Sequence, residues 1–321
     1  MHTTGRQPLA SLGLPVFNGE RFVAEAIESL LAQEGVEFEL VISDNGSTDG
    51  TEEICRAAAG RDSRVRYIRH DVNRGAAWNY NHVVDAARGR YFKWCAHDDL
   101  YAPGFLARCV EVLDADDSVS ACYTLATDID ESGAPIHEYP PFPYADGGDP
   151  ADRARAVLDN PTPCFESFAL VRRAQLLRTG RIGAYTSSDR TLMFELALLG
   201  RFHEVPERLF FHRQHQDRSV FRFKDPRERN AWFDPSRAEV FTLPRWRLVA
   251  EHAKAVQRAD VPVGCRLRVG ASVGRWTAQS AGPLARQLGA WAVHRARAGR
   301  HHVAVPADAR QSLPQVAEKS A

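Results

Sequence analysis

The chain has 321 residues, of which 44% are hydrophobic and 26% charged, as in an ordinary globular protein with a sizeable core. Lysine plus arginine and aspartate plus glutamate both number 41, so the charge balance gives no argument for a nucleic-acid partner. Six scattered cysteines form no CxxC pair, which excludes the usual zinc-ribbon and redox motifs and favours reduced thiols in a cytoplasm. No 18 apolar residues run together, and the N-terminal residues predict no signal peptide.

The first 130 residues alternate strand and helix patterns. Short apolar runs predict strands, and apolar residues three or four positions apart predict the helices between them. The predicted strands are 9–14, 38–42, 65–69, 91–95 and 119–125; the predicted helices are 20–33, a second ending at 59, 76–87 and 103–113. Asn18 is expected to cap the first helix. This alternation predicts an α/β fold with a doubly wound, mostly parallel sheet.

The pattern changes after residue 130. Residues 135–150 hold five prolines and two glycines, so we expect a loop or flap over a site, or a linker. Further predictions are a strand at 165–171, helices at 172–178 and 187–199, and short strands at 201–205 and 208–212. From about residue 226 the pattern is helical to about 298, and the tail from 301 is expected to be loose.

Two adjacent aspartates follow a buried strand. The segment YFKWC runs into His97-Asp98-Asp99. Side-by-side carboxylates repel each other unless a cation lies between them, and ligands of open α/β sheets bind beyond the carboxyl ends of the strands. The pair therefore predicts a divalent metal facing a phosphorylated ligand. The alternative is that Asp98 caps the helix near Pro103 and Asp99 lies in solvent.

Two other strand ends carry polar groups that are expected to face the same crevice. The first strand leads into PVFNGE and the second into Asp44. Asp44 either forms its turn or accepts hydrogen bonds from a nucleotide base or ribose. Neither a glycine-rich Rossmann turn nor a P-loop is present, so phosphate would be bound by a metal and basic side chains.

Four segments then occur in a familiar order and spacing. They are LPVFNGERFVAEAIESLLAQ, FELVISDNGSTDGTEEI, NRGAAWNYN and WCAHDDLYAPGFL. Together they resemble the family 2, GT-A-fold glycosyltransferases, over about residues 9–130 and more weakly to about 220. The resemblance implies a nucleotide-sugar-binding half at 1–130 and an acceptor-binding half at 131–225 of one GT-A domain. Residues 226–321 would form a helical C-terminal extension with a loose tail.

The resemblance also implies a donor site built from the turns of the first half. The turn after the first strand and the aspartate after the second would hold base and ribose, and the NRG turn would line the nucleotide pocket. Asp98 would contact the ribose or the sugar. The donor-binding residues implied in this way are Pro15, Phe17, Asn18, Glu20, Asp44, Asn73, Arg74, Gly75 and Asp98.

The aspartate pair stands where the family carries its DXD-type motif. Asp99 would ligate Mn²⁺ or Mg²⁺ through the donor diphosphate, and the metal would neutralise the charge growing on the leaving group. The sequence has HDD where a D-x-D is often found, so the division of roles between Asp98 and Asp99 stays open.

Two segments of the second half resemble further family motifs. Ser188-Asp189 matches the acidic pair that opens a helix, with Ser188 replacing the usual acid; Asp189 would be the base of an inverting transfer. The alternative for Asp189 is a first-turn carboxylate favoured by the helix dipole. The segment 211–215, FHRQH, follows a strand and resembles the family's YRxH segment. In this YRxH-like segment, Arg213 would pair with phosphates and His215 would ligate the metal or diphosphate. The alternative for His215 is an ordinary surface histidine.

Four aromatic residues near these motifs are candidates for lining the pocket: Trp78, Tyr80, Trp94 and Tyr101. Of these, Trp94 and Tyr101 are the preferred candidates, although such spacing is also typical of a core.

The C-terminal region is basic. Residues 251–321 contain eleven basic and four acidic residues, a net charge of +7, together with tryptophans. Such a surface suits peripheral contact with an anionic membrane and a lipid-linked acceptor. The alternative is that these helices pack on the catalytic domain or on a subunit partner.

The combined prediction is an inverting, metal-dependent glycosyltransferase that adds one sugar from a UDP- or dTDP-sugar to a glycan, glycolipid or metabolite hydroxyl. The QxxRW motif of processive members is missing. One rival, a nucleotidyltransferase, requires a glycine-rich basic loop after the first strand. Another, a sugar-nucleotide-binding protein without catalysis, is suggested only by Ser188. The sugar, acceptor, metal and oligomeric state stay open.

Overall fold

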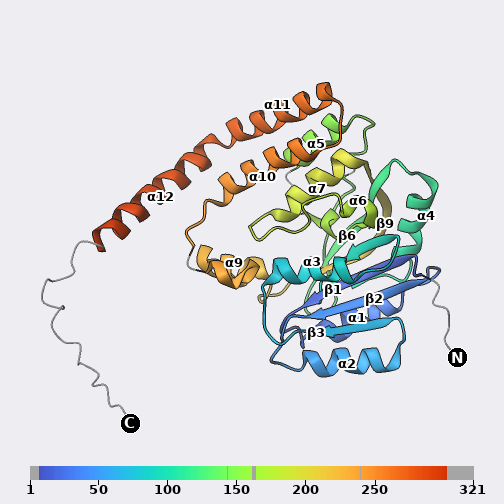
Figure 1. Cartoon of the computed structure of the whole chain (residues 1–321). Helices are drawn as coiled ribbons and strands as arrows, with labels where there is room; N and C mark the ends of the chain where they lie inside the picture. The colour runs from blue at the N-terminus through green and yellow to red at the C-terminus, as the bar shows by residue number, and fades with distance from the viewer. Residues whose placement is uncertain (1–6, 143, 161–163, 239, 302–321) are drawn as a thin grey trace, which may run out of the picture.

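One sheet runs through the molecule, with helices on both of its faces (Figure 1). The computed structural model describes residues 7–142, 144–160, 164–238 and 240–301. The strands are β1 (Ala10–Val16), β2 (Phe38–Asp44), β3 (Val65–Arg69), β4 (Tyr91–Trp94), β5 (Leu100–Tyr101), β6 (Val119–Ile129), β7 (Pro135–Glu138), β8 (Leu170–Arg172) and β9 (Arg201–Arg213).

The helices connect these strands and then extend the chain beyond the sheet. The α-helices are α1 (Val23–Leu31), α2 (Thr51–Arg61), α3 (Ala76–Ala86), α4 (Phe105–Ala115), α5 (Pro150–Asp159), α6 (Arg173–Leu176), α7 (Ser188–Leu199), α8 (Ser219–Arg222), α9 (Pro226–Phe233), α10 (Pro244–Arg258), α11 (Val263–Gln279) and α12 (Ala281–His301). The 3-10 helices are η1 (Phe165–Phe168) and η2 (Pro235–Arg237).

The sheet has a parallel half and a mixed half. Its strand order is β3-β2-β1-β4-β8-β6-β9-β5, with β7 paired to β6. Strands β3, β2, β1 and β4 are mutually parallel, whereas β8 runs antiparallel to both β4 and β6. Strand β9 is parallel to β6. The predicted α/β class, with a doubly wound sheet and a helical C-terminal extension, is confirmed.

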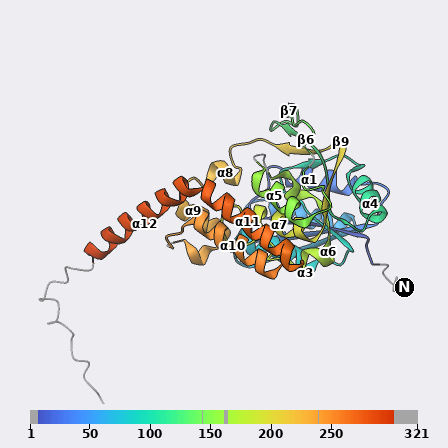
Figure 2. The same ribbon diagram turned by 90° about the horizontal axis from the view of Figure 1, so that it is seen from above.

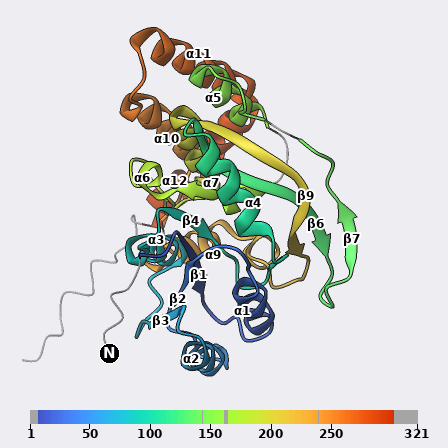
Figure 3. The same cartoon turned by 90° about the vertical axis from the view of Figure 1, so that its right-hand side faces the viewer.

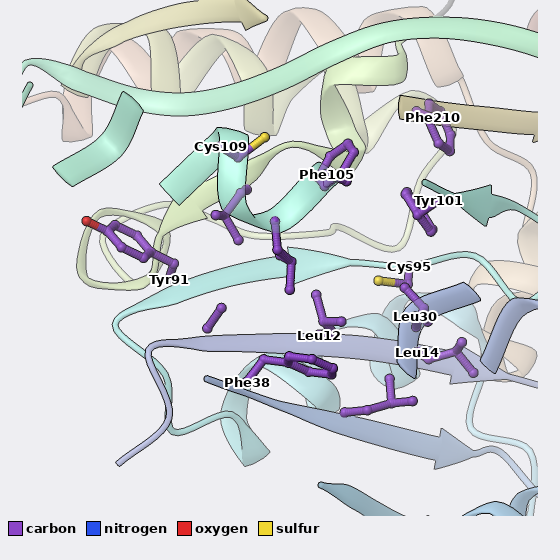
Figure 4. Close-up of a cluster of buried hydrophobic side chains, with 14 of the residues drawn as sticks. Leu12, Leu14, Leu30, Phe38, Tyr91, Cys95, Tyr101, Phe105, Cys109 and Phe210 are labelled. Carbon is purple, nitrogen blue, oxygen red and sulfur yellow. The ribbon is translucent and has the colours of Figure 1, made fainter. Parts of the chain in front are cut away.

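Side chains alternate between the two faces of the sheet because successive residues of a strand point to opposite sides. On β1, Leu12 and Leu14 join Leu30 of α1 and Phe105 of α4 in one buried cluster (Figure 4). On the opposite face, Gly13 lets α3 approach, since a Cβ there would lie 2.8 Å from Val83. The second cluster draws on α3, α5, α7, α10 and α11.

The second half differs from the sequence prediction in several elements. The proline-rich segment contains β7 and α5 instead of only a loop, and Figure 3 shows β7 beside β6. The two strands predicted after residue 200 form one strand, β9, whose register against β6 shifts around Pro206. Strand β1 continues through Pro15, where the sequence prediction ended it. Its pairing with β4 ends at Gly13, so the sheet does not need a backbone N–H from Pro15 on that side.

The C-terminal helices pack on one another and then leave the body. Helix α11 packs on α5 and α10, and α12 extends away from the sheet in Figures 1 and 2. None of the described helices is both long and apolar enough to cross a bilayer. The predicted loose tail, residues 302–321, lies outside the described residues.

Candidate functional site

The turns after β1 and β2 are joined into one unit by hydrogen bonds. The backbone N–H of Asn18 donates to Oγ of Ser47 at 2.9 Å, and the N–H of Thr48 donates to Oδ1 of Asn18 at 2.8 Å. The N–H of Gly19 donates to Oγ1 of Thr51 at 2.8 Å. Small polar side chains at these positions therefore fix the two strand ends relative to each other.

The first turn presents an aromatic ring and a carboxylate at the surface. Phe17 is 41% exposed directly after β1, and Oε2 of Glu20 accepts from the N–H of Gly50 at 2.7 Å. The prediction that Asn18 caps α1 is wrong. Asn18 adopts φ 51° and bonds to Thr48, and α1 begins only at Val23.

Asp44 is fully buried beneath the second turn. One of its oxygens accepts from the hydroxyl of Tyr67 at 2.7 Å and from Arg69 at 2.9 Å. The other accepts from the N–H of Ser47 at 2.8 Å. With 0% exposure, this carboxylate supports the turn from inside, and its contact with a nucleotide stays a prediction.

The NRG turn is held against β2 by Asn45, which the sequence reasoning missed. Its amide donates to Oδ1 of Asn73 at 2.9 Å and to the carbonyl of Gly75 at 3.2 Å, while its oxygen accepts from the N–H of Arg74 at 3.0 Å. In the sequence, Asn45 could have been noticed as an amide side chain, with both donors and an acceptor, directly after Asp44. The turn predicted to line the nucleotide pocket thus has a fixed shape.

Gly75 is packed beneath a segment from the far end of the chain. Its φ is +89°, and a Cβ there would lie 2.4 Å from the carbonyl oxygen of Phe233 at the end of α9. Only glycine fits this backbone conformation and this close approach. The C-terminal extension therefore lies directly over the NRG turn.

The third strand end meets the first. A Cβ at Gly19 would lie 2.7 Å from Cδ2 of His97, so the loop carrying the aspartate pair touches the turn after β1. Asp98 Oδ2 lies 2.8 Å from Nε2 of His215, and Asp99 Oδ1 accepts from the N–H of Arg213 at 3.0 Å. The structure thus brings together the three strand ends and the YRxH-like segment.

The two aspartates lie in different electrostatic environments. The pKa of Asp98 is lowered to about 2, because the opposing effect of burial is outweighed by the charge of His97 and the hydrogen bond from His215. Burial and the charge of Asp98 raise the pKa of Asp99 well above its usual range. Such a pair favours the arrival of a cation.

The residues present fit a divalent cation that substrate oxygens would complete. Within the described ranges, no group of three or more His, Cys, Asp or Glu side chains is arranged to hold a metal alone. Among the same residues, Nδ1 of His215 is buried without a hydrogen-bond partner. Asp99 offers the kind of oxygen ligand that Mg²⁺ and Mn²⁺ prefer, and Mg²⁺ is usually bound by one or two carboxylates plus substrate phosphates.

Arg213 is buried among protein groups, and its contact with the donor phosphates stays a prediction. It is 0% exposed, and its Nη2 donates to Oε2 of Glu25 at 2.7 Å. Its Nη1 donates to the carbonyl of Glu131 at 2.6 Å and its Nε to the carbonyl of Asp98 at 3.0 Å. All three nitrogens donate to protein groups, so in this structure Arg213 fixes the Asp98 loop.

Arg218 is a cation of this region that the sequence reasoning missed. Its positive charge acts to lower the pKa of Asp99, so it lies near the aspartate pair. It is half-buried and contacts Nε2 of His212 at 2.7 Å. In the sequence, Arg218 could have been noticed as a basic residue in a polar run, three positions after His215.

Asp189 opens α7 beside a second buried carboxyl group. Burial raises the pKa of Asp189, although the N–H of Arg190 donates to its Oδ1 at 2.9 Å. Burial also raises the pKa of Glu166 to about 8, and the hydroxyl of Tyr144 donates to Glu166. A carboxyl group with a raised pKa is a stronger base when ionised, which suits proton transfer near neutral pH.

Tyr80 of α3 has a hydroxyl whose pKa is raised, first by burial and then by the negative charges of Asp98, Asp99 and Asp189. All three carboxylates therefore act on this one hydroxyl. The preference for Trp94 and Tyr101 as pocket-lining residues is wrong, since they are 2% and 3% exposed within the core.

Comparisons with known proteins agree on one family. The model described as "Glycosyl transferase family 2" matches residues 11–178. An uncharacterized glycosyltransferase of Rickettsia felis is 33% identical over 135 residues, 42% of this chain and 22% of its own length. The chondroitin synthase of Escherichia coli is 32% identical over 131 residues, 41% of this chain and 19% of its own. The chain thus covers under a quarter of these two relatives.

Solved structures with low sequence identity share the fold. TarS 1-349 of S. aureus, solved in complex with UDP-GlcNAc, superposes with a TM-score of 0.53 at 14% identity, covering 78% of this chain and 81% of its own. The mannosyltransferase PcManGT of Pyrobaculum calidifontis, in complex with GDP-Man and Mn²⁺, gives 0.50 at 18% identity, covering 90% and 80%.

Proposed function

Because this chain belongs to glycosyl transferase family 2, we propose that it transfers one sugar from a nucleoside-diphosphate sugar to an acceptor hydroxyl, with inversion at the anomeric carbon. Residues 1–130 bind the donor, 131–225 bind the acceptor, and the helical extension from 226 covers part of both. Nucleoside-diphosphate sugars are named in the complexes of both structural neighbours. UDP or dTDP is the favoured nucleotide, by the resemblance of the first two turns to the family.

The observation that carries this proposal is the contact of the aspartate pair with the second half of the chain: Asp98 Oδ2 lies 2.8 Å from Nε2 of His215, and Asp99 accepts from the N–H of Arg213 at 3.0 Å. The charges of Asp98 and Asp99, on the donor side, and of Asp189, on the acceptor side, also raise the pKa of the Tyr80 hydroxyl. A transfer reaction needs the donor's leaving group and the acceptor's proton acceptor within reach of one sugar. The convergence of these carboxylates supports that arrangement.

Asp189 is the proposed general base. Its carboxylate takes the proton of the acceptor hydroxyl while the hydroxyl oxygen bonds to the anomeric carbon, and the bond from that carbon to the diphosphate oxygen breaks. Burial raises the pKa of Asp189, which strengthens it as a base.

Asp99 and His215 are the proposed protein ligands of Mn²⁺ or Mg²⁺. When bound, the metal supplies positive charge to the leaving diphosphate. Asp98, paired with His215 at 2.8 Å, orients the imidazole and faces the donor sugar or ribose. Arg213 holds the backbone of this loop in place through the Asp98 carbonyl.

The first test is a thermal-shift screen with UDP, dTDP, GDP and CMP, each with and without Mn²⁺. We expect one diphosphate to raise the Tm by roughly 5 °C at a hundredfold excess over its Kd, and only with metal. Asp99→Ala should abolish this shift, whereas Asp117→Ala, at a side chain that is 91% exposed, should keep it. The donor-site proposal fails if no nucleotide shifts the wild-type protein under either condition.

The C-terminal helices are the proposed contact with an anionic membrane surface. The described stretch of α11 and α12, residues 263–301, contains seven arginines and no acidic residue. Val263 and Leu267 are each 70% exposed on α11, and Leu288 and Trp291 are exposed on α12. Such helices bind anionic lipid through apolar contact and charge. The six free thiols suit a reducing cytoplasm on that face.

Vesicle co-sedimentation tests this contact. The protein should sediment with phosphatidylglycerol vesicles and not with phosphatidylcholine vesicles, and Leu267→Ser with Trp291→Ser should weaken binding severalfold. Val72→Ser, at an exposed apolar residue outside these helices, is the matched control. Equal sedimentation with both lipids, or no effect of the double variant, contradicts a docking surface here.

A further inference from the structure

A cavity of about 420 Å³ lies beside the start of α7, among the C-terminal helices. It lies between the end of α5, the start of α7 and three helices of the extension, α10, α11 and α12. Its lining includes Asn160, Arg190, Arg245, His252, Trp276 and Gln287. Its volume suits one or two sugar rings.

Two arginines line the cavity. They are Arg190 and Arg245, and none of the described residues in its lining is acidic. The N-terminal ends of two helices, α7 and α10, also meet there, and neither has a side-chain cap among the described residues. Helix N-termini and arginine side chains both favour an anion.

His252 gives an independent sign of a ligand. It is 2% exposed and lines the cavity, yet neither ring nitrogen has a hydrogen-bond partner among the described residues. Because buried polar atoms are nearly always hydrogen-bonded, these two ring nitrogens of His252 indicate a place for a ligand's polar groups. Burial lowers its pKa to about 4, so near neutral pH the ring offers one donor and one acceptor.

An aromatic wall completes the cavity. The ring of Trp276 meets the imidazole of His252 edge-on, with centroids 5.2 Å apart, and Phe194 packs on His252 at 4.9 Å. Thr186 and Gln287 add hydroxyl and amide groups to the lining. A tryptophan beside several polar groups suits a ring that has an apolar face and hydroxyl substituents.

The cavity adjoins the proposed base. Ser187 and Arg190 flank Asp189 in the chain, and Asn160, another lining residue, donates to Glu166 at 3.3 Å. Arg190 also donates to the carbonyl of Asn160 at 3.0 Å. Ser187 has φ 65°, a conformation that non-glycine residues rarely adopt and that is enriched at functional sites.

We infer that this cavity binds an anionic sugar residue of the acceptor, with its carboxylate or phosphate between Arg190 and Arg245 and its ring beside Trp276 and His252. This inference rests on the proposed function in treating the ligand as part of the acceptor. The uronate and the sugar phosphate share the required chemistry of a hydroxylated ring with one anionic group.

Direct binding of three probes to the full chain tests the inference. Calorimetric titrations with glucuronate, glucose 6-phosphate and glucose should show at least tenfold tighter binding of one anionic sugar than of glucose, and the tighter of the two anions identifies the group. Arg245→Ala should weaken that binding at least tenfold. Arg286→Ala, next to Gln287 but outside the lining, should leave it unchanged.

A second variant tests the orphaned histidine. His252→Phe keeps an aromatic ring between Phe194 and Trp276 but removes both nitrogens, so we expect severalfold weaker binding with an unchanged Tm. Equal affinity for glucose and the anionic sugars, no binding of any probe, or unchanged affinity in Arg245→Ala overturns the inference. These titrations need no donor. Loss of the nucleotide shift would therefore count against the proposed function alone, and loss of sugar binding against the cavity alone.

Discussion

Polar groups have different environments in two regions of the molecule: the turns after β1 and β2, and the start of α7. In the turns, Asn18, Ser47 and Thr51 form hydrogen bonds that join two backbones. At the start of α7, burial raises the pKa of the carboxyl groups of Glu166 and Asp189. Satisfied polar atoms make a rigid site for binding, whereas buried carboxyl groups with raised pKa values are suited to exchanging protons. Changes in the first region should therefore affect shape, and changes in the second should affect chemistry.

The largest effect is expected at Asp189. Asp189→Asn removes the proposed base while keeping the size of the side chain, so turnover should fall by about 10²–10⁴-fold. The nucleotide-dependent shift in Tm should persist, because the turns proposed to bind the donor are unchanged. Steady-state transfer assays beside thermal shifts measure both. Full activity in this variant would remove Asp189 from the mechanism, and absence of turnover even in the wild type would favour a binding protein without catalysis.

The next effect is on pH dependence, at Glu166. The pKa of this carboxyl group is about 8 in the folded protein against 4.5 ordinarily, so between these values the folded state keeps a proton that the unfolded chain has lost. Stability should therefore fall as pH rises from about 4.5 to 8, by up to about 1.4 kcal/mol per unit. Glu166→Gln should flatten this slope in urea unfolding at several pH values. The exposed control Glu53→Gln should leave the slope as in the wild type.

A smaller effect is expected where the first region meets the C-terminal extension. Gly75→Ala should destabilise the protein by about 2 kcal/mol, because of its positive φ and its close approach to Phe233. Gly274→Ala in the middle of α11, where a Cβ meets nothing within 4 Å, should instead stabilise it by about 0.5–1 kcal/mol. Urea unfolding compares the two. Similar stability changes in both would mean that α9 does not press on the NRG turn.

The smallest effect is expected within the joined turns. Ser47→Ala removes the acceptor for the N–H of Asn18 and should cost about 1 kcal/mol of stability, with weaker nucleotide binding. Ser63→Ala, at an exposed serine, should cost nearly nothing. An unchanged nucleotide affinity in Ser47→Ala would show that the hydrogen bonds between the turns do not shape the pocket.

The same contrast explains which elements were predictable. The strand at 65–69 was predicted with its observed bounds, because apolar periodicity and flanking turns are local signals. Helix α5 was missed because five prolines dominated its surroundings, although Asp149 caps it and Pro150 occupies its first turn, a known start signal. Strand β9 was divided in two at Pro206, where a register shift lets the strand continue.

The sequence predicted where the site residues lie relative to strands and helices, but not which residues they bond to. The sequence indicated that Asp44, Asp98 and Asp189 lie near strand ends or helix starts, which the structure shows. It did not reveal that Arg213 is bonded to Glu25, which lies 188 positions earlier. Burial and long-range pairing depend on the tertiary fold, and no local pattern in one sequence contains them.

The contact between Gly75 and Phe233 has a consequence for biosynthesis. The NRG turn leaves the ribosome long before the residue that covers it, since 158 positions separate the two. At a synthesis rate of about 5–20 residues per second, Phe233 is added roughly 8–30 s after Gly75. During synthesis the first half of the chain can form its parallel strands, but this turn stays open until the C-terminal extension arrives. A nascent chain therefore has its parallel strands well before it has the complete form of the proposed nucleotide pocket.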